Sequence, residues 1–251
     1  MPSKYKLRPS SAERFLTCTA SLPLNLGFEE SVHTLLGNLQ HKVAHLRLDQ
    51  YFNGANHEMN IEHLTNEDNY YVSSNDPNLK VKWNKQCQET VDNYVTYIKR
   101  LEKQFKPKLV FLEYFIKMTF FGNQINGVVD CAMILPDNSI IIIDLKTGRG
   151  RVETEDNAQM LMYGYGILQD MYKKTKVVAK KVVISIAQAV INNMQAIEYS
   201  LEDLQTWYAN QAKAMKEINN DNLQFRPSPS ACKYCQARDT CVARIKKGVI
   251  V

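Results

Sequence analysis

The chain has 251 residues, enough for one large domain with a sizeable apolar core. Its hydrophobic fraction of 45% and charged fraction of 23% are typical of a globular protein, and its net charge of +5 is compatible with a polyanionic partner without indicating one. No stretch approaches the roughly 20 apolar residues of a membrane span, and the first residues lack the apolar core of a signal peptide. We therefore expect a cytoplasmic protein, in a bacterium or an infected host cell, with reduced cysteines.

The first half of the chain is predicted to be mainly helical. A short helix is expected near residues 12–16, and apolar residues then recur at helical spacing over residues 31–53 and again over 83–105. Between the two longer helices, residues 54–80 are polar, with few apolar positions. We expect this segment to be a loop or insertion.

The second half is predicted to alternate strands and helices. Strands are expected at residues 109–116, 118–121, 127–135, 139–146, 181–187 and 195–199, and helices at 156–172 and 200–218. This order favours an α/β fold of one domain spanning residues 1–251, in which helices flank a central mixed sheet.

The most informative stretch is a predicted hairpin around a Pro-Asp-Asn turn centred on Asp137. Asp130 and Asp144 lie seven residues before and seven residues after this centre. A symmetric register would place them opposite each other, with Cβ atoms roughly 4.5–5.5 Å apart. Lys146 follows Asp144 by two positions and projects from the same face, whereas Leu145 points the other way. Two acids and a lysine on an otherwise apolar sheet are costly unless a partner such as a divalent metal ion pairs with them.

This pattern is typical of a metal-dependent phosphodiesterase. Asp130 and Asp144, with the backbone carbonyl of Leu145, offer the oxygen ligands that Mg²⁺ or Mn²⁺ takes. Lys146 is placed to orient water or to neutralise charge that develops on a phosphate. The alternative is a surface salt bridge between Asp144 and Lys146 at the end of a strand. Spacing alone leaves both interpretations open.

Three further features lie outside the hairpin. Gln159 and Tyr163 are one turn apart on the following helix, so both can face the acids, although the same pattern suits a solvated glutamine and a core tyrosine. His41, on the helix at residues 31–53, is a candidate metal ligand. Glu113 is a lone carboxylate among apolar residues. It is either a further ligand or, as we slightly favour, a residue on the solvated face of an edge strand.

The cysteines form a second strong pattern. Cys232, Cys235 and Cys241 follow C-x₂-C-x₅-C within the segment 230–245, and three thiolates so close in sequence favour a shared metal centre. Cys18 is the available fourth ligand, which would dock the C-terminal cysteine cluster on the N-terminal segment. Thiolates select zinc or an iron–sulfur cluster, and the residues alone leave both open.

Taken in order, these motifs resemble those of RecB-type nucleases in the PD-(D/E)xK superfamily. The resemblance extends from Ser11 to Cys241, with residues 54–80 unmatched, and rests on Gly37-x₃-His41, Gly127-Val128-Val129-Asp130, Asp144-Leu145-Lys146 and Gln159-x₃-Tyr163. The cysteines resemble the iron–sulfur subgroup, seen in the AddB helicase–nuclease subunit and in the CRISPR-adaptation nuclease. The length is similar to that of stand-alone phage-encoded members.

The resemblance implies a restriction-endonuclease-like fold and a role for each matched residue. It implies metal ligation by His41, Asp130, Asp144 and the Leu145 carbonyl, a catalytic role for Lys146, and contact with DNA near the cleavage site by Gln159 and Tyr163. It also implies a structural [4Fe–4S] cluster, with Zn²⁺ as the alternative, held by Cys18, Cys232, Cys235 and Cys241.

We expect the protein to be a DNA nuclease that depends on Mg²⁺ or Mn²⁺. We expect it to act as an exonuclease on single-stranded ends in recombination, repair or phage DNA metabolism. A recombination or single-strand-binding protein is a further expected partner, and no membrane association is expected. The alternative is a non-catalytic DNA-binding or recombination-partner protein that keeps the fold. Arg149, Arg151 and the basic run 173–176 would contact phosphates in either case.

Overall fold

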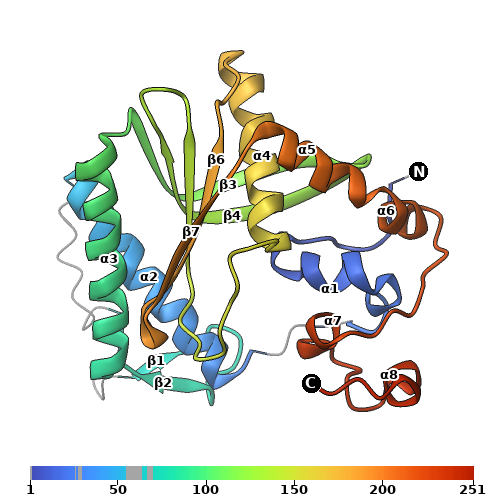
Figure 1. Cartoon of the computed structure of the whole chain (residues 1–251). Helices are drawn as coiled ribbons and strands as arrows, with labels where there is room; N and C mark the ends of the chain where they lie inside the picture. Colours follow the sequence, from blue (N-terminus) through green and yellow to red (C-terminus); the bar gives the residue numbers. More distant parts are fainter. Residues whose placement is uncertain (1, 26, 28–29, 55–63, 67–69) are drawn as a thin grey trace.

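A computed structural model shows a five-stranded sheet with helices on both of its faces (Figure 1). It describes residues 2–25, 27, 30–54, 64–66 and 70–251. The strands of this sheet run in the order β3 (Leu109–Phe120), β4 (Asn123–Ile134), β5 (Ile140–Leu145), β6 (Val182–Gln188) and β7 (Asn193–Tyr199). In this sheet β5 and β6 are parallel, and the other neighbours are antiparallel. The predicted mixed α/β fold is therefore confirmed.

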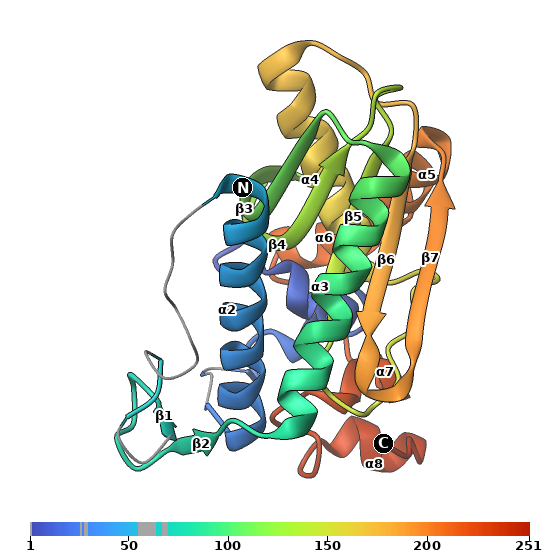
Figure 2. The same ribbon diagram turned by 90° about the vertical axis from the view of Figure 1, so that its left-hand side faces the viewer.

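The helices divide between the two faces of the sheet (Figure 1 and Figure 2). One core layer lies between the sheet and the two helices α2 (Val32–Asn53) and α3 (Lys85–Phe105). The other layer is formed by α1 (Ala12–Thr17), α4 (Ala158–Thr175), α5 (Leu201–Asn210) and α6 (Ala212–Asn219). Because both faces are covered, β5 is buried along its whole length.

The hairpin of β4 and β5 has the predicted register. Its pairs are symmetric about Asp137 as far as Cys131–Ile143. The same register, continued by one residue, places Asp130 opposite Asp144. This geometry follows from the turn and from the β-branched runs on either side of it, which the sequence already contains.

β3 and β4 form a second hairpin, whose strands are longer than predicted. The chain reverses at Phe121 and Gly122, both of which have positive φ angles, 47° and 79°. Such a turn matches the right-handed twist of the two strands. Glycine suits this conformation because it has no Cβ, whereas Phe121 adopts it at a steric cost.

The ladder between β3 and β4 is interrupted where Glu113 faces Asp130. The two residues lie across from each other between regular pairs, and Glu113 has a left-handed φ of 48°. On one side of the interruption Leu112 packs in the α2–α3 layer, and on the other side Tyr114 packs in the α4 layer. In an uninterrupted strand these two residues would point to the same face. The interruption therefore twists both strands at the position of the two acids.

The polar segment 54–80, expected to be a loop or insertion, holds one short strand in its described part, and a second strand begins at its last residue. β1 (Tyr70–Val72) and β2 (Lys80–Lys82) pair antiparallel, and we call them the β1–β2 ribbon. The ribbon lies beside the N-terminal half of α2 (Figure 2). Val81 is buried in the α2–α3 layer and holds the ribbon against the domain.

The C-terminal segment docks on the N-terminal one, as predicted (Figure 1). Cys18 is the C-cap residue of α1, and it packs with Ala231 of α7 (Pro229–Lys233). The backbone N–H of Gln236 donates a hydrogen bond of 3.0 Å to Asn25 Oδ1. The chain continues into α8 (Val242–Lys247).

The helix predicted over residues 200–218 is divided into α5 and α6. The division falls at Gln211, whose backbone N–H donates to the carbonyl of Tyr208 at 3.0 Å, one residue short of regular α-helical bonding. The capping box predicted at Ser200 and Asp203 is present. Within the described part of the chain, no helix is both long and apolar enough to cross a membrane.

Candidate functional site

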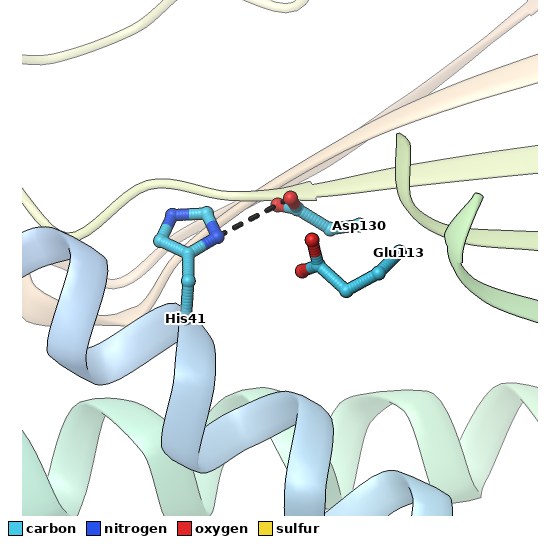
Figure 3. Close-up of side chains that lie close together, drawn as sticks. All are labelled: His41, Glu113 and Asp130. Atoms are coloured by element: carbon cyan, nitrogen blue, oxygen red, sulfur yellow. Dashed lines mark ion pairs between the residues drawn. The ribbon is translucent and has the colours of Figure 1, made fainter. Parts of the chain in front are cut away.

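Three side chains from different elements meet on the α2 side of the sheet (Figure 3). His41 comes from α2, Glu113 from β3 and Asp130 from β4, and one ligand atom of each lies within 4.8 Å of the others. His41 Nδ1 is 3.2 Å from Asp130 Oδ1, and the Glu113 carboxyl group is turned toward the same space (Figure 3). Among the described residues, no other three His, Cys, Asp or Glu side chains lie so close together. We call these residues the ligand triad.

Glu113 is the member of the triad whose place sequence reasoning slightly disfavoured. It is an exposed residue on the edge strand β3, as expected, yet its carboxyl group also faces Asp130 and His41. The exposure of Glu113 and the direction of its carboxyl group both follow from its left-handed backbone, which interrupts the regular alternation of side chains along β3. The sequence signal was a single acid within an otherwise apolar strand.

A second cluster lies on the α4 side, around Asp144. Lys146 Nζ is 2.8 Å from Asp144 Oδ2 and donates to Gln159 Oε1 at 3.0 Å. Gln159 Nε2 in turn donates to Asp144 Oδ1 at 3.1 Å and to the hydroxyl of Tyr163 at 3.3 Å. The four residues that the sequence motifs singled out here are therefore brought together. We call them the lysine cluster.

The two clusters are joined through the end of β5. The backbone N–H of Leu145 donates to Asp130 Oδ2 at 2.7 Å, so one oxygen of Asp130 is held by β5 while the other faces His41. Asp144 is buried, and each of its oxygens faces a donor: Lys146 Nζ lies 2.8 Å from Oδ2, and Gln159 Nε2 donates to Oδ1. A buried carboxylate is costly unless it is paired, and Lys146 supplies this pairing.

The charges of His41, Glu113 and Asp130 shift one another's pKa values. Burial lowers the pKa of His41, but the adjacent Asp130 carboxylate raises it by a larger amount, so that the pKa is about 9. Burial opposes ionisation of Asp130 as well, and His41 nevertheless holds the pKa of Asp130 below its usual value. Partial burial and the charge of Asp130 raise the pKa of Glu113 to about 7. At neutral pH His41 therefore carries a proton, and its positive charge balances the acids.

The lysine cluster keeps its ammonium charge. Burial lowers the pKa of Lys146, but Asp144 and Asp130 raise it above its ordinary value. Burial raises the pKa of Asp144, and the ion pair with Lys146 acts against this. A charged ammonium beside a buried carboxylate can donate hydrogen bonds to an anionic ligand at pH 7.

The donor set of the triad fits a hard divalent cation. Carboxylate oxygens suit Mg²⁺ and Mn²⁺, and a neutral imidazole is the commonest side-chain ligand of metal ions in proteins. The three ligand atoms come from three elements, and the register of the hairpin places the Asp144 carboxylate opposite Asp130. A cation would take over the role that the protonated His41 plays in balancing the acids.

Within the lysine cluster, Tyr163 is buried, with its ring against Gly127, and its hydroxyl reaches Gln159. The two predicted arginines lie outside both clusters. Arg149 and Arg151 lie in the exposed loop after β5, where Arg149 donates to Gln86 Oε1 and Arg151 pairs with Glu153. The Leu145 carbonyl remains a predicted ligand.

The C-terminal segment 230–245, which we call the cysteine segment, lies close to the same loop, because a Cβ atom at Gly150 would lie 3.5 Å from Lys233 Nζ. Burial raises the pKa of Cys18, and the neighbouring thiols of Cys232 and Cys235 act in the same direction. Cys18 Sγ accepts from the N–H of Arg226 at 3.4 Å, and Cys235 Sγ accepts from Asn25 Nδ2 at 3.5 Å. Cys241 is the N-cap residue of α8.

One comparison with solved structures identifies the class of fold. The structure is similar to that of a candidate exonuclease from Eubacterium rectale, with a TM-score of 0.52 and 12% sequence identity, over 94% of this chain and 88% of that chain. The chain therefore shares its overall fold with that protein. It belongs to the family described as "Protein of unknown function (DUF2800)", whose profile matches residues 5–250.

Two further solved structures are more distantly similar. SSO0001 has a TM-score of 0.42 and 12% identity, over 97% of this chain and 89% of that chain. VC1899 from Vibrio cholerae has a TM-score of 0.26 and 10% identity, over 85% of this chain and 53% of that chain. Neither likeness is close enough to support an argument about this chain.

Proposed function

We propose that the protein is a Mg²⁺- or Mn²⁺-dependent DNA nuclease, acting as an exonuclease on DNA ends. The observation that carries the proposal is the meeting of two clusters where the ladder between β4 and β5 ends: a triad of metal-type ligands and a charged lysine held by a carboxylate and an amide. A salt bridge alone needs neither the histidine nor the second and third acids.

The metal would be held by His41, Glu113 and Asp130, with Asp144 and the Leu145 carbonyl as further ligands. A bound divalent cation would polarise the phosphate and stabilise negative charge on its oxygens. Glu113 is added to the ligand set by its position, and not by the sequence motifs.

The lysine cluster would act on the phosphate from the other side. The reaction adds water to phosphorus and breaks one P–O bond, leaving a hydroxyl on one product and a phosphate monoester on the other. Lys146 is fixed by Asp144 and Gln159, so its ammonium group can donate to the phosphate or to the attacking water without reorganisation. Gln159 is itself held by Tyr163, which makes Tyr163 a positioning residue.

We further propose that Cys18, Cys232, Cys235 and Cys241 hold an iron–sulfur cluster with a structural role. What supports the proposal is that these cysteines come together from both ends of the chain: Cys18 packs with Ala231 of α7, and the thiols of Cys232 and Cys235 are close enough to raise the pKa of Cys18. Thiolates select zinc or an iron–sulfur cluster, and the metal content of the purified protein distinguishes the two.

The cleavage test uses end-labelled single-stranded and double-stranded DNA with Mn²⁺, Mg²⁺ or EDTA. The wild type should release label with either metal and not in EDTA, and Asp144→Ala and Lys146→Ala should lose at least about 100-fold in rate. Lys181→Ala is the matched control, because Lys181 also pairs with a carboxylate, that of Glu198 at 2.6 Å, but precedes β6 at the end of the sheet away from Asp144. Normal cleavage by Lys146→Ala would overturn the assignment, and binding without cleavage by the wild type would favour the non-catalytic alternative.

A further inference from the structure

The outer face of the β1–β2 ribbon combines an aromatic ring with two lysines. Tyr70 is paired with Lys82, and Val72 is paired with Lys80, so these four side chains share one face of the ribbon. The ammonium groups of Lys80 and Lys82 lie 4.7 Å and 5.3 Å from the centre of the Tyr70 ring. Val72 adds an exposed apolar surface beside them.

The ribbon is anchored on its other side. Val81 is buried in the α2–α3 layer, and Tyr71, its partner in the ladder, packs partly against the same layer. Ser73 follows β1 and donates to Glu30, in the segment that leads into α2. The outer face is thus presented by a fixed element, and not by a free loop.

Lys42 links the ribbon to the ligand triad. Its ammonium lies 5.8 Å from the centre of the Tyr71 ring, and its side chain also lines a hollow next to the triad. The other residues lining the hollow are Asn38, His41, His45 and Glu113. Asn38, His41, Lys42 and His45 recur at helical spacing, so they form one face of α2.

The hollow is lined by side chains that can contact a phosphate. Lys42 and Asn38 are both exposed, and Asn38 Nδ2, which carries two hydrogens, donates to Glu30 Oε1 at 3.2 Å. The Lys42 ammonium and the Asn38 amide can therefore donate to a phosphate that lies between the ribbon and the triad.

We propose that the β1–β2 ribbon is a stacking platform for single-stranded DNA, and that Lys42 and Asn38 guide the same strand from the ribbon to the ligand triad. This inference rests on the proposed function and specifies its substrate. Tyr70 stacks on a base, and Lys80 and Lys82 bind the phosphates on either side of that base.

The chemistry of the platform selects a single strand. A base can stack on Tyr70 only when it is unpaired, because the faces of paired bases are covered by their neighbours in a duplex. The three lysines along the path match a polyanion that passes over the surface, and their flexible side chains can move from the ring to phosphates. Stacking and charge together are the usual combination in sequence-independent single-strand binding.

The test measures binding, separately from cleavage. A fluorescein-labelled oligothymidylate of roughly 16 nucleotides is titrated with protein in EDTA, and anisotropy is recorded at several salt concentrations. Tyr70→Ala should weaken binding by about 5- to 100-fold, whereas Tyr70→Phe, which keeps the ring, should stay within about twofold of wild type. The double variant Lys80→Ala/Lys82→Ala should lower the salt dependence of log K by about 1.4, for two lost phosphate contacts.

Tyr172→Ala is the matched control. Tyr172 is an exposed tyrosine with Lys176 at 5.5 Å from its ring, but it lies at the C-terminal end of α4, far from the ribbon (Figure 1). Its removal should leave binding unchanged. Melting temperatures of all variants check that each one is folded.

Three results would overturn the inference: wild-type affinity in both Tyr70→Ala and the double lysine variant, equal weakening by Tyr172→Ala, or no binding of the oligonucleotide by the wild type. A loss of duplex binding as large as the loss of single-strand binding would also reject stacking. Tighter binding of oligouridylate would replace DNA by RNA as the ligand. Because EDTA prevents metal-dependent cleavage, a failure here is distinguishable from a failure of the proposed nuclease activity.

Discussion

The imidazole of His41 is the residue whose state changes most when a metal binds. In the metal-free protein it lies 3.2 Å from Asp130 and has a pKa of about 9, so it is protonated at pH 7.5. A metal ligand must be neutral, so binding requires the loss of this proton. Glu113, with a pKa of about 7, must also be ionised in order to bind.

Manganese binding should therefore release protons. Calorimetric titration with Mn²⁺ at pH 7.5, in buffers of different ionisation enthalpy, should show release of about one proton per ion. His41→Ala should abolish most of this release. Affinity should weaken as the pH falls below about 7, because Glu113 then becomes protonated as well. Binding without proton release would contradict the place of His41 in the ligand set.

Gln159 tests the lysine cluster by itself. Gln159→Ala removes the acceptor that orients Lys146 and the donor to Asp144, so turnover should fall by roughly 100-fold with little change in stability. Gln169→Ala is the matched control on the same helix. Gln169 bonds to the backbone of Thr119, so its loss should lower the melting temperature and leave turnover intact. Normal turnover in Gln159→Ala, together with a loss of turnover in Gln169→Ala, would contradict the assignment of Gln159 to the site.

At this scale, sequence reasoning found the residues that occur in short motifs. Asp144, Lys146, Gln159 and Tyr163 could be predicted to meet, because strand and helix periodicity place each pair on one face. The contribution of Glu113 could not be predicted in the same way. It depends on one left-handed backbone angle, which leaves no periodic signal in the sequence.

The β3–β4 hairpin is the element that packs against Tyr163, a member of the lysine cluster. A Cβ atom at Gly127 would lie 2.7 Å from the Tyr163 ring and 2.9 Å from Pro9. Gly127→Ala should therefore destabilise the protein by about 1–3 kcal/mol, measured by urea unfolding, and should lower activity by displacing Tyr163. Gly148→Ala has nothing within 4 Å of its new Cβ and should be neutral. Equal effects of the two substitutions would contradict this close packing.

Elements with long apolar runs were predictable, and elements that depend on a few contacts were not. The register of β4 and β5 follows from a turn and two β-branched runs that cannot slip without exposing the core. The β1–β2 ribbon has three residues in each strand and one fully buried side chain, Val81, so no periodic pattern identifies it. Its pairing is determined by tertiary contact with α2.

At the scale of the whole molecule, the cysteine segment brings the chain ends together near the site. A Cβ atom at Gly150, in the loop after Lys146, would lie 3.5 Å from Lys233 Nζ in the cysteine segment. Loss of the cluster should therefore loosen both the C-terminal segment and the loop that leaves the lysine cluster. The sequence predicted this docking through its cysteine spacing, because four thiolates share a centre only when both ends approach.

Protein purified without oxygen should contain iron and sulfide. Cys18→Ser should lose the iron, lower the melting temperature by several degrees and expose the segment after Pro227 to proteolysis. Cys87→Ser is the control, because Cys87 is buried in α3 and should keep the iron content of wild type. Stoichiometric zinc in place of iron, in protein kept anaerobic throughout, would reject the cluster.

The central claim is that the ligand triad makes this protein a metal-dependent nuclease. The most direct test is the rate of label release from single-stranded DNA as a function of Mn²⁺ concentration, for wild type, Asp130→Asn and Asp137→Asn. Asp137 is an aspartate of the same hairpin that binds Ser139 in the turn, so its variant controls for loss of a carboxylate. We predict saturable cleavage by wild type and Asp137→Asn, and none by Asp130→Asn at any Mn²⁺ concentration. Cleavage by Asp130→Asn at the wild-type rate, or by wild type in EDTA, would contradict the account.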